Sequence, residues 1–169
     1  IFGKNAGLSL DAGSNQNVFI GENVSDAAMN DATMNVGVGY NALSGLTTGD
    51  LNNVIGASAA QSLTTGQRNI MIGYGAGFTT TDVDYGIFLG HEAAGDGNIT
   101  AAADGTIAIG HRALKVLTSG TRNVAIGSGS MAATTSGLDN VAVGTEALHT
   151  AVTSDYNVAV GERALHKHV

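Results

Sequence analysis

Apolar residues in this chain occur in short groups of three that end at a glycine, as in 141–144 and 158–161. This glycine, called the marker glycine below, recurs at a nearly constant spacing along the whole chain, with one longer interval. The pattern therefore predicts a repeat protein rather than an ordinary globular domain. The marker glycines are Gly3, Gly21, Gly39, Gly56, Gly73, Gly90, Gly110, Gly127, Gly144 and Gly161.

The residues one and three before each marker glycine are nearly all aliphatic, and most of them are β-branched. Residues two apart share one face of a strand, and β-branched side chains suit a pleated surface. Turn sequences follow at 46–49, 63–66 and 117–120, where a glycine comes after Thr or Ser. Each repeat therefore predicts one short strand followed by turns.

The repeat unit, from one marker glycine to the next, is too short for a helical hairpin or a propeller blade, but it fits one coil of a parallel β-solenoid. We expect an all-β solenoid of about ten coils, the first and last incomplete, forming a single domain over 1–169. The longer interval, between Gly90 and Gly110, predicts a loop insertion at 94–105. The sequence does not predict the handedness of the coil.

The residue two before each marker glycine is also apolar, so the expected strands are apolar on both faces. A strand of this kind is usually buried on both sides. We expect one face to fill the coil and the other to meet a second copy of the chain; alternatively, the small residues only pack a flat, tight coil. The sequence hypothesis places the oligomer interface at Ala108, Ala125, Ala142 and Ala159.

Asparagine recurs four residues before the marker glycine in seven of nine repeats, with Gly86 and Thr106 at the other two. Stacked coils would align these amides so that each bonds its neighbour or a turn backbone. We therefore expect a structural ladder and not a binding site. Its members are Asn17, Asn35, Asn52, Asn69, Asn123, Asn140 and Asn157.

Opposite charges recur two residues after consecutive marker glycines. Glu92 lies one coil before Arg112, and Glu146 lies one coil before Arg163. Stacking would place each glutamate beside its arginine, which helps to fix the register of the coils. We therefore expect ion pairs with a structural role.

The segments "NVAIGSGSM", "NVAVGTEAL" and "NVAVGERAL" resemble the "N-x-A-I-G-x-x-A-L" repeats of phage tail fibres and tailspikes. They are also similar to repeats in the heads of trimeric autotransporter adhesins. The resemblance implies a homotrimer of β-rolls or β-helices, other fibre or tail proteins as partners, and a virion location. It carries over no catalytic residue, because the shared motif is structural.

Composition narrows the function further. The chain has 14 acidic and 7 basic residues, a formal charge of −7, which argues against nucleic acid and anionic membranes as partners. It has no cysteine, and no apolar run is long enough to span a bilayer. The chain begins without Met, which predicts a fragment of a longer fibre.

Few residues in the sequence suggest metal binding or catalysis. His149 and His166 lie five residues after consecutive marker glycines, where stacking would bring them together. Asp96 and Asp104 lie in the insertion and offer carboxylate oxygens, which are ligands that suit Ca²⁺. The alternative is an exposed column and a bulged surface loop. We expect no cofactor and no catalytic site, with these four residues as weak metal candidates.

We therefore expect a structural rod of a phage tail fibre or tailspike that supports attachment to a host cell, and not an enzyme. The alternatives are a trimeric bacterial adhesin head that binds host matrix or glycan at the cell surface, a glycan depolymerase, and an ice-binding solenoid. The last is suggested by a threonine column at Thr47, Thr64, Thr81, Thr118 and Thr135. In either appendage a host surface glycan or protein is a further partner.

Overall fold

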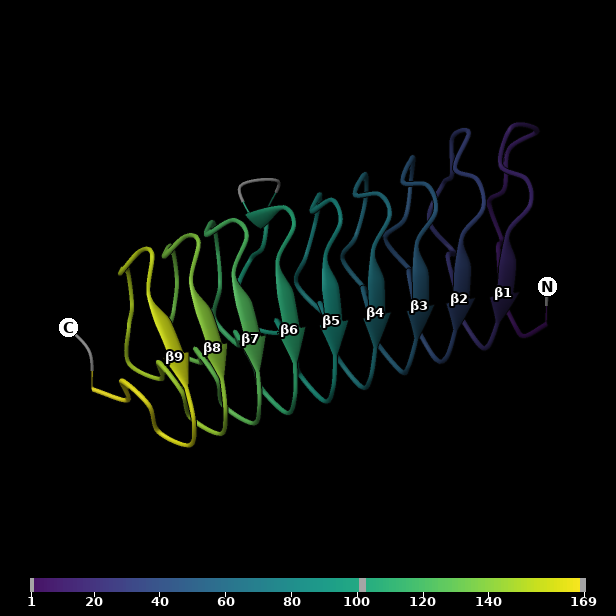
Figure 1. Cartoon of the computed structure of the whole chain (residues 1–169). Helices are drawn as coiled ribbons and strands as arrows, with labels where there is room; N and C mark the ends of the chain where they lie inside the picture. The colour runs from purple at the N-terminus through teal and green to yellow at the C-terminus, as the bar shows by residue number, and fades with distance from the viewer. Residues whose placement is uncertain (1, 101–102, 168–169) are drawn as a thin grey trace.

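The computed structural model of the chain describes residues 2–100 and 103–167. The chain winds into a parallel β-solenoid whose turns stack side by side into a rod (Figure 1). Each turn contributes one strand of three residues to a single nine-stranded sheet. The strands are β1 (Val18–Ile20), β2 (Val36–Val38), β3 (Asn53–Ile55), β4 (Ile70–Ile72), β5 (Ile87–Leu89), β6 (Ile107–Ile109), β7 (Val124–Ile126), β8 (Val141–Val143) and β9 (Val158–Val160).

Every strand pairs in parallel with the next strand in the chain, so the order in the sheet is the order in the sequence. The register keeps equivalent residues opposite each other, as in Val141 opposite Val158 and Ala142 opposite Ala159. This confirms the expected all-β parallel solenoid. About eight turns are formed, fewer than the ten coils expected. No strand precedes the first marker glycine, Gly3, because Phe2 forms only an isolated bridge to Ile20.

The longer repeat leaves the sheet undisturbed. Strands β5 and β6 keep the same register across the interval between Gly90 and Gly110, so the extra residues are accommodated outside the strands. Ile99 and Ala103 within this segment are fully buried. Residues 101 and 102 of the expected insertion at 94–105 lie outside the described part of the chain.

The core of the coil contains the central residue of every strand. These residues form the inner column, and all of them are buried in the isolated chain. The column consists of Phe19, Gly37, Val54, Met71, Phe88, Ala108, Ala125, Ala142 and Ala159.

The expectation that Ala108, Ala125, Ala142 and Ala159 meet another chain is therefore wrong, because these side chains point into the coil and are already buried there. The central and flanking residues of a short strand point to opposite faces. The chain bends toward the face of the central residue at both ends of each strand, which makes that face the interior. The sequence pattern correctly predicted that each strand has two apolar faces. The hypothesis drawn from it placed the central residues outside the coil, whereas they lie inside.

The marker glycines have a backbone conformation that other residues rarely adopt, with φ between 121° and 140°. They also bring the backbones of successive turns close together. A Cβ atom added to Gly110 would lie 2.6 Å from the carbonyl oxygen of Gly127 in the next turn. Both conformation and contact therefore require glycine at this position.

Candidate functional site

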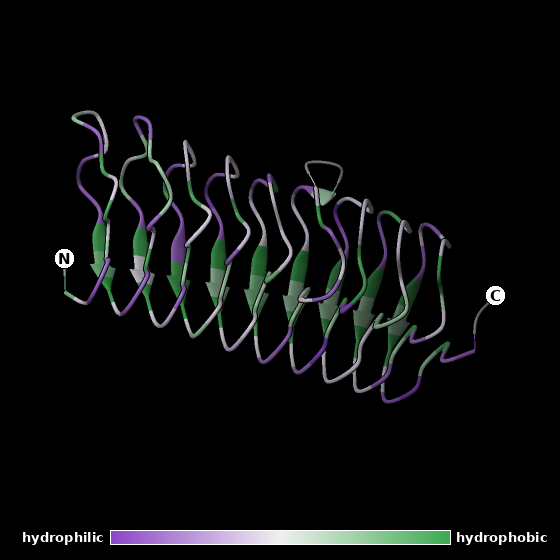
Figure 2. Cartoon of the chain, turned by 180° about the vertical axis from the view of Figure 1, so that it is seen from behind, coloured by the Kyte–Doolittle hydropathy of each residue, from purple (hydrophilic) through white to green (hydrophobic). Residues whose placement is uncertain are grey.

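The two residues that flank the centre of each strand point away from the coil and form an apolar strip along the rod. The strands are mainly hydrophobic, as their green colour in Figure 2 shows. We call this strip the sheet face; it contains Val, Ile and Leu, with Asn53 as its one polar side chain. Its residues are half-buried or exposed, and the exposed fraction reaches 70% for Val160 at the end of the rod. Because parallel sheets are normally covered on both faces, the sheet face is the main candidate for an interaction surface.

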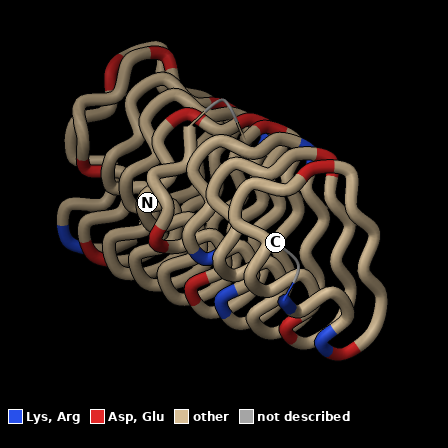
Figure 3. Tube along the Cα trace, turned by 90° about the vertical axis from the view of Figure 1, so that its left-hand side faces the viewer, with Lys and Arg blue, Asp and Glu red and all other residues tan. Residues whose placement is uncertain are grey.

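Charged residues avoid the sheet face. Lys, Arg, Asp and Glu lie mainly in the bends along the edges of the rod, while the walls between these edges carry few charges (Figure 3). A second copy of the chain could therefore approach the sheet face without bringing charge into the contact, although each chain has a formal charge of −7.

The expected ion pairs between successive turns are confirmed. The Nε atom of Arg112 lies 2.7 Å from Oε2 of Glu92, and the Nε atom of Arg163 lies 2.8 Å from Oε2 of Glu146. In each pair the hydrogen bond from the arginine is the main cause that lowers the pKa of the glutamate. These side chains link neighbouring turns and are paired with each other, which gives them a structural role.

The asparagine ladder is also present. The Nδ2 atom of Asn52 donates to Oδ1 of Asn35 over 3.0 Å, and Nδ2 of Asn69 donates to Oδ1 of Asn52 over 2.9 Å. Each oxygen also accepts from the backbone N–H of the next asparagine, and Nδ2 of Asn52 donates to the carbonyl of Gly66. Asn123, Asn140 and Asn157 repeat this arrangement, so the amides satisfy buried polar groups of the coil.

A second ladder was missed in the sequence. Aspartates six residues before several marker glycines accept from a backbone N–H of the preceding turn, as Asp50 does from Thr33 and Asp84 from Gln67. The signal in the sequence was the recurrence of aspartate two residues before the asparagine column. However, that position is not occupied by aspartate in every repeat. Asp104 belongs to this ladder, because its Oδ1 accepts from the N–H of Asp84 over 2.8 Å.

The threonine column is used for stacking. The hydroxyl of Thr64 donates to the carbonyl of Thr81 over 2.9 Å, and that of Thr118 donates to the carbonyl of Thr135 over 2.8 Å. Because these hydroxyls bond the next turn, they do not form a free array for ordering water. Nothing in this geometry favours ice binding.

Of the four metal candidates, only the two histidines come together, and the two aspartates have other partners. Asp96 pairs with Lys115 over 3.0 Å, while Asp104 bonds the backbone as described above. His149 and His166 stack with their ring centroids 5.2 Å apart and their planes 4° from parallel. Within residues 2–100 and 103–167, no three His, Cys, Asp or Glu side chains form a group that could hold a metal ion.

Comparisons with known proteins add no relative: no family model, no curated protein and no solved structure matches the chain. Over the described residues there is no helix of the length and apolar character needed to cross a membrane.

Proposed function

We propose that the chain is a structural rod that associates with two further copies of itself through the sheet face. The observation that supports this proposal is the strip of half-buried and exposed aliphatic residues that runs along all nine strands. Covering such a strip is favourable by about 25 cal/mol for each Å² of apolar surface removed from water. A strip that is continuous along the rod fits a partner of the same length.

A second copy of the chain is the partner that best fits the sheet face. The surface repeats at every turn, so identical rods present rows of side chains with the same spacing. Each chain offers two aliphatic columns about 7 Å apart along the strand. In a trimer around a common axis, each column packs against a column from a different neighbour.

The rod itself is held by stacking along its whole length. Parallel pairing, the asparagine ladder and the threonine column all join each turn to the next. In repeat structures of this kind a turn is stabilised by its neighbours, which favours slow unfolding. A stiff trimeric rod suits a phage tail fibre or a comparable appendage that supports attachment to a host cell, as the resemblance of the repeats also suggests.

Self-association is tested by placing charge on the sheet face. In a variant with Ile72→Lys and Ile126→Lys, we expect trimers to dissociate, because two partly exposed side chains would bring cations into the apolar contact. Val152→Lys is the matched control, since Val152 is similarly exposed but lies in a turn outside the sheet face. The mass in solution is measured by analytical ultracentrifugation, with circular dichroism to verify folding.

A wild-type monomer at micromolar concentration would overturn the proposed assembly, and a wild-type dimer would overturn the threefold arrangement. Retention of the trimer by the folded double variant would remove the sheet face as the contact surface. Tail genes beside the gene for this chain are expected for a phage fibre, whereas a gene that continues into a membrane-anchor barrel would indicate an adhesin instead.

A further inference from the structure

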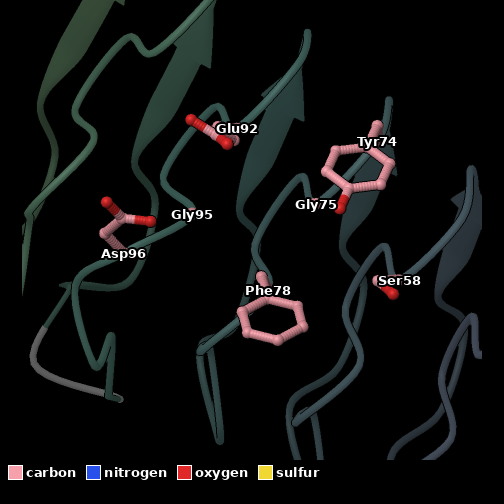
Figure 4. Close-up of a pocket in the computed structure, with 7 residues that line it drawn as sticks. All are labelled: Ser58, Tyr74, Gly75, Phe78, Glu92, Gly95 and Asp96. Atoms are coloured by element: carbon pink, nitrogen blue, oxygen red, sulfur yellow. The ribbon is translucent and has the colours of Figure 1, made fainter.

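A cavity of about 180 Å³ opens on the surface between three successive turns, those that follow β3, β4 and β5 (Figure 4). The aromatic rings of Tyr74 and Phe78 come from the middle turn, and the carboxylates of Glu92 and Asp96 come from the next. The cavity lies within one chain, so it is formed whether or not copies of the rod associate.

The cavity exists because two side chains of the repeat are missing. Gly75 lies two residues after its marker glycine, where Asn41 adopts the same left-handed backbone conformation. A Cβ atom on Gly75 would meet only Cγ of Glu92, at an ordinary distance of 3.8 Å, so packing does not require glycine there. Gly129 is the equivalent residue farther along the rod, but there the ring of His149 fills the space and bonds the carbonyl of Gly129. Gly95 replaces this histidine beside Gly75, and the space stays open.

The aromatic walls offer apolar surface to a ligand. One face of the Tyr74 ring stacks on His91, with centroids 5.1 Å apart. Among the residues that the structure describes, no other ring stacks on Tyr74, since the preceding turn has Ala57 in the same column. Phe78 is 38% exposed although it is fully apolar. Such surfaces suit the C–H face of a saturated ring.

The two carboxylates are suited to accepting hydrogen bonds rather than to binding a cation. Arg112 bonds Oε2 of Glu92, and Lys115 pairs with Oδ2 of Asp96 over 3.0 Å, so their charges are balanced by the next turn. Among the described residues, Oε1 of Glu92 and Oδ1 of Asp96 remain available to accept from hydroxyl groups. Ser58 at the opposite side of the cavity adds a hydroxyl that can donate or accept.

From this combination of two aromatic surfaces, two charge-balanced carboxylates and the hydroxyl of Ser58 around a small hollow, we propose that the cavity binds a single neutral pyranose unit of a carbohydrate. The C–H face of the sugar lies against Tyr74 or Phe78, and its hydroxyls donate to Glu92 and Asp96. One sugar ring has few atoms, so we expect a dissociation constant on the order of 1 mM for an isolated unit.

The test is saturation-transfer NMR on the intact chain with the methyl pyranosides of glucose, galactose and N-acetylglucosamine, and with choline as a cationic probe. We expect transfer to at least one pyranoside. It should fall to background in Gly75→Asn, which fills the cavity, and in Tyr74→Ala, which removes a wall. Tyr40→Ala is the matched control, because Tyr40 lies in the same column with similar exposure but away from the cavity.

Transfer to none of the three pyranosides, or to choline alone, overturns the proposal. Transfer that is unchanged in both Gly75→Asn and Tyr74→Ala overturns it as well, because the sugar would then bind elsewhere. The mass in solution is measured on the same samples and should not change, so that failure of sugar binding can be told apart from failure of the proposed assembly.

Discussion

At the scale of single residues, the solenoid depends on backbone conformations that most residues avoid. Each turn has a marker glycine and three further positions with positive φ, two of them after the marker and one five residues before it. Non-glycine residues such as Leu114, Arg112 and Arg122 adopt φ near 50° to 60° at these three positions. The marker position itself is always glycine, because a side chain would be strained there and, except at Gly161, would also meet the next turn.

Replacing two different marker glycines should therefore separate the cost of backbone strain from the cost of a steric clash with the next turn. Gly161→Ala meets no atom within 4 Å, so it should cost only backbone strain, about 1–3 kcal/mol. Gly110→Ala should cost clearly more, because its Cβ would lie 2.6 Å from the carbonyl oxygen of Gly127. Urea unfolding of both variants measures the difference, and equal losses of stability would contradict the role of close stacking.

The asparagine ladder gives a second prediction at this scale. Asn52→Ala should lower the free energy of unfolding by about 2–4 kcal/mol, because it leaves buried partners on both neighbouring turns without hydrogen bonds. Asn157→Ala is the control, since Asn157 is partly exposed and its partners can reach water. A loss for Asn52→Ala no greater than for Asn157→Ala in thermal or urea unfolding would argue against the ladder as a stabilising element.

At the scale of one turn, two walls of the coil share a fixed interior volume. The first wall contributes the inner column of the sheet, and the second contributes the residue four after the marker glycine. Large residues of the inner column, Met71 and Phe88, belong to turns with Gly77 and Ala94 in the second wall. Small ones face large partners, as in the turn of Ala142 with Leu148. The narrow coil thus keeps a nearly constant interior volume, because a large side chain on one wall is combined with a small one on the other.

This exchange predicts rescue within one turn. Phe88→Ala should destabilise the chain by about 3–5 kcal/mol by leaving a cavity. Adding Ala94→Leu should recover part of that loss, because the turn then has the composition of the turn that contains Ala142 and Leu148. A double-mutant cycle in urea unfolding measures the coupling, and additive losses would show that the two walls do not share the volume.

At the scale of the whole molecule, hydrogen bonds and ion pairs run along the rod in columns, and several carboxylates have lowered pKa values. Arg122 hydrogen bonds Asp139 and is the main cause that lowers its pKa, as Arg163 does for Glu146. A carboxylate with a lower pKa in the folded state stabilises the fold above its unfolded pKa. That contribution is lost as the pH falls through the folded value, because the unfolded chain then binds more protons.

The ordinary pKa values are 4.5 for a glutamate such as Glu146 and 3.8 for an aspartate such as Asp139. We therefore expect the melting temperature to be nearly constant from neutral pH to just above these values, and to decrease at lower pH. The variant Arg122→Gln with Arg163→Gln should show a shallower fall, because its carboxyls titrate closer to their unfolded values. The change should be modest, since both pairs are exposed to solvent. Identical pH profiles for the two proteins in calorimetry would contradict this role of the columns.

The sequence by itself determined the repeat, the parallel strands, their register and the asparagine ladder. Each of these follows from local rules: alternation sets the strand, constant spacing sets the stacking, and equivalent residues must then lie side by side. It also showed that both faces of each strand are apolar. What only the tertiary structure decided is which face is inside, because alternation is the same for a coil that bends either way. That bend places the alanines in the core and the aliphatic strip outside, and the same stacking opens the cavity where Gly75 and Gly95 meet.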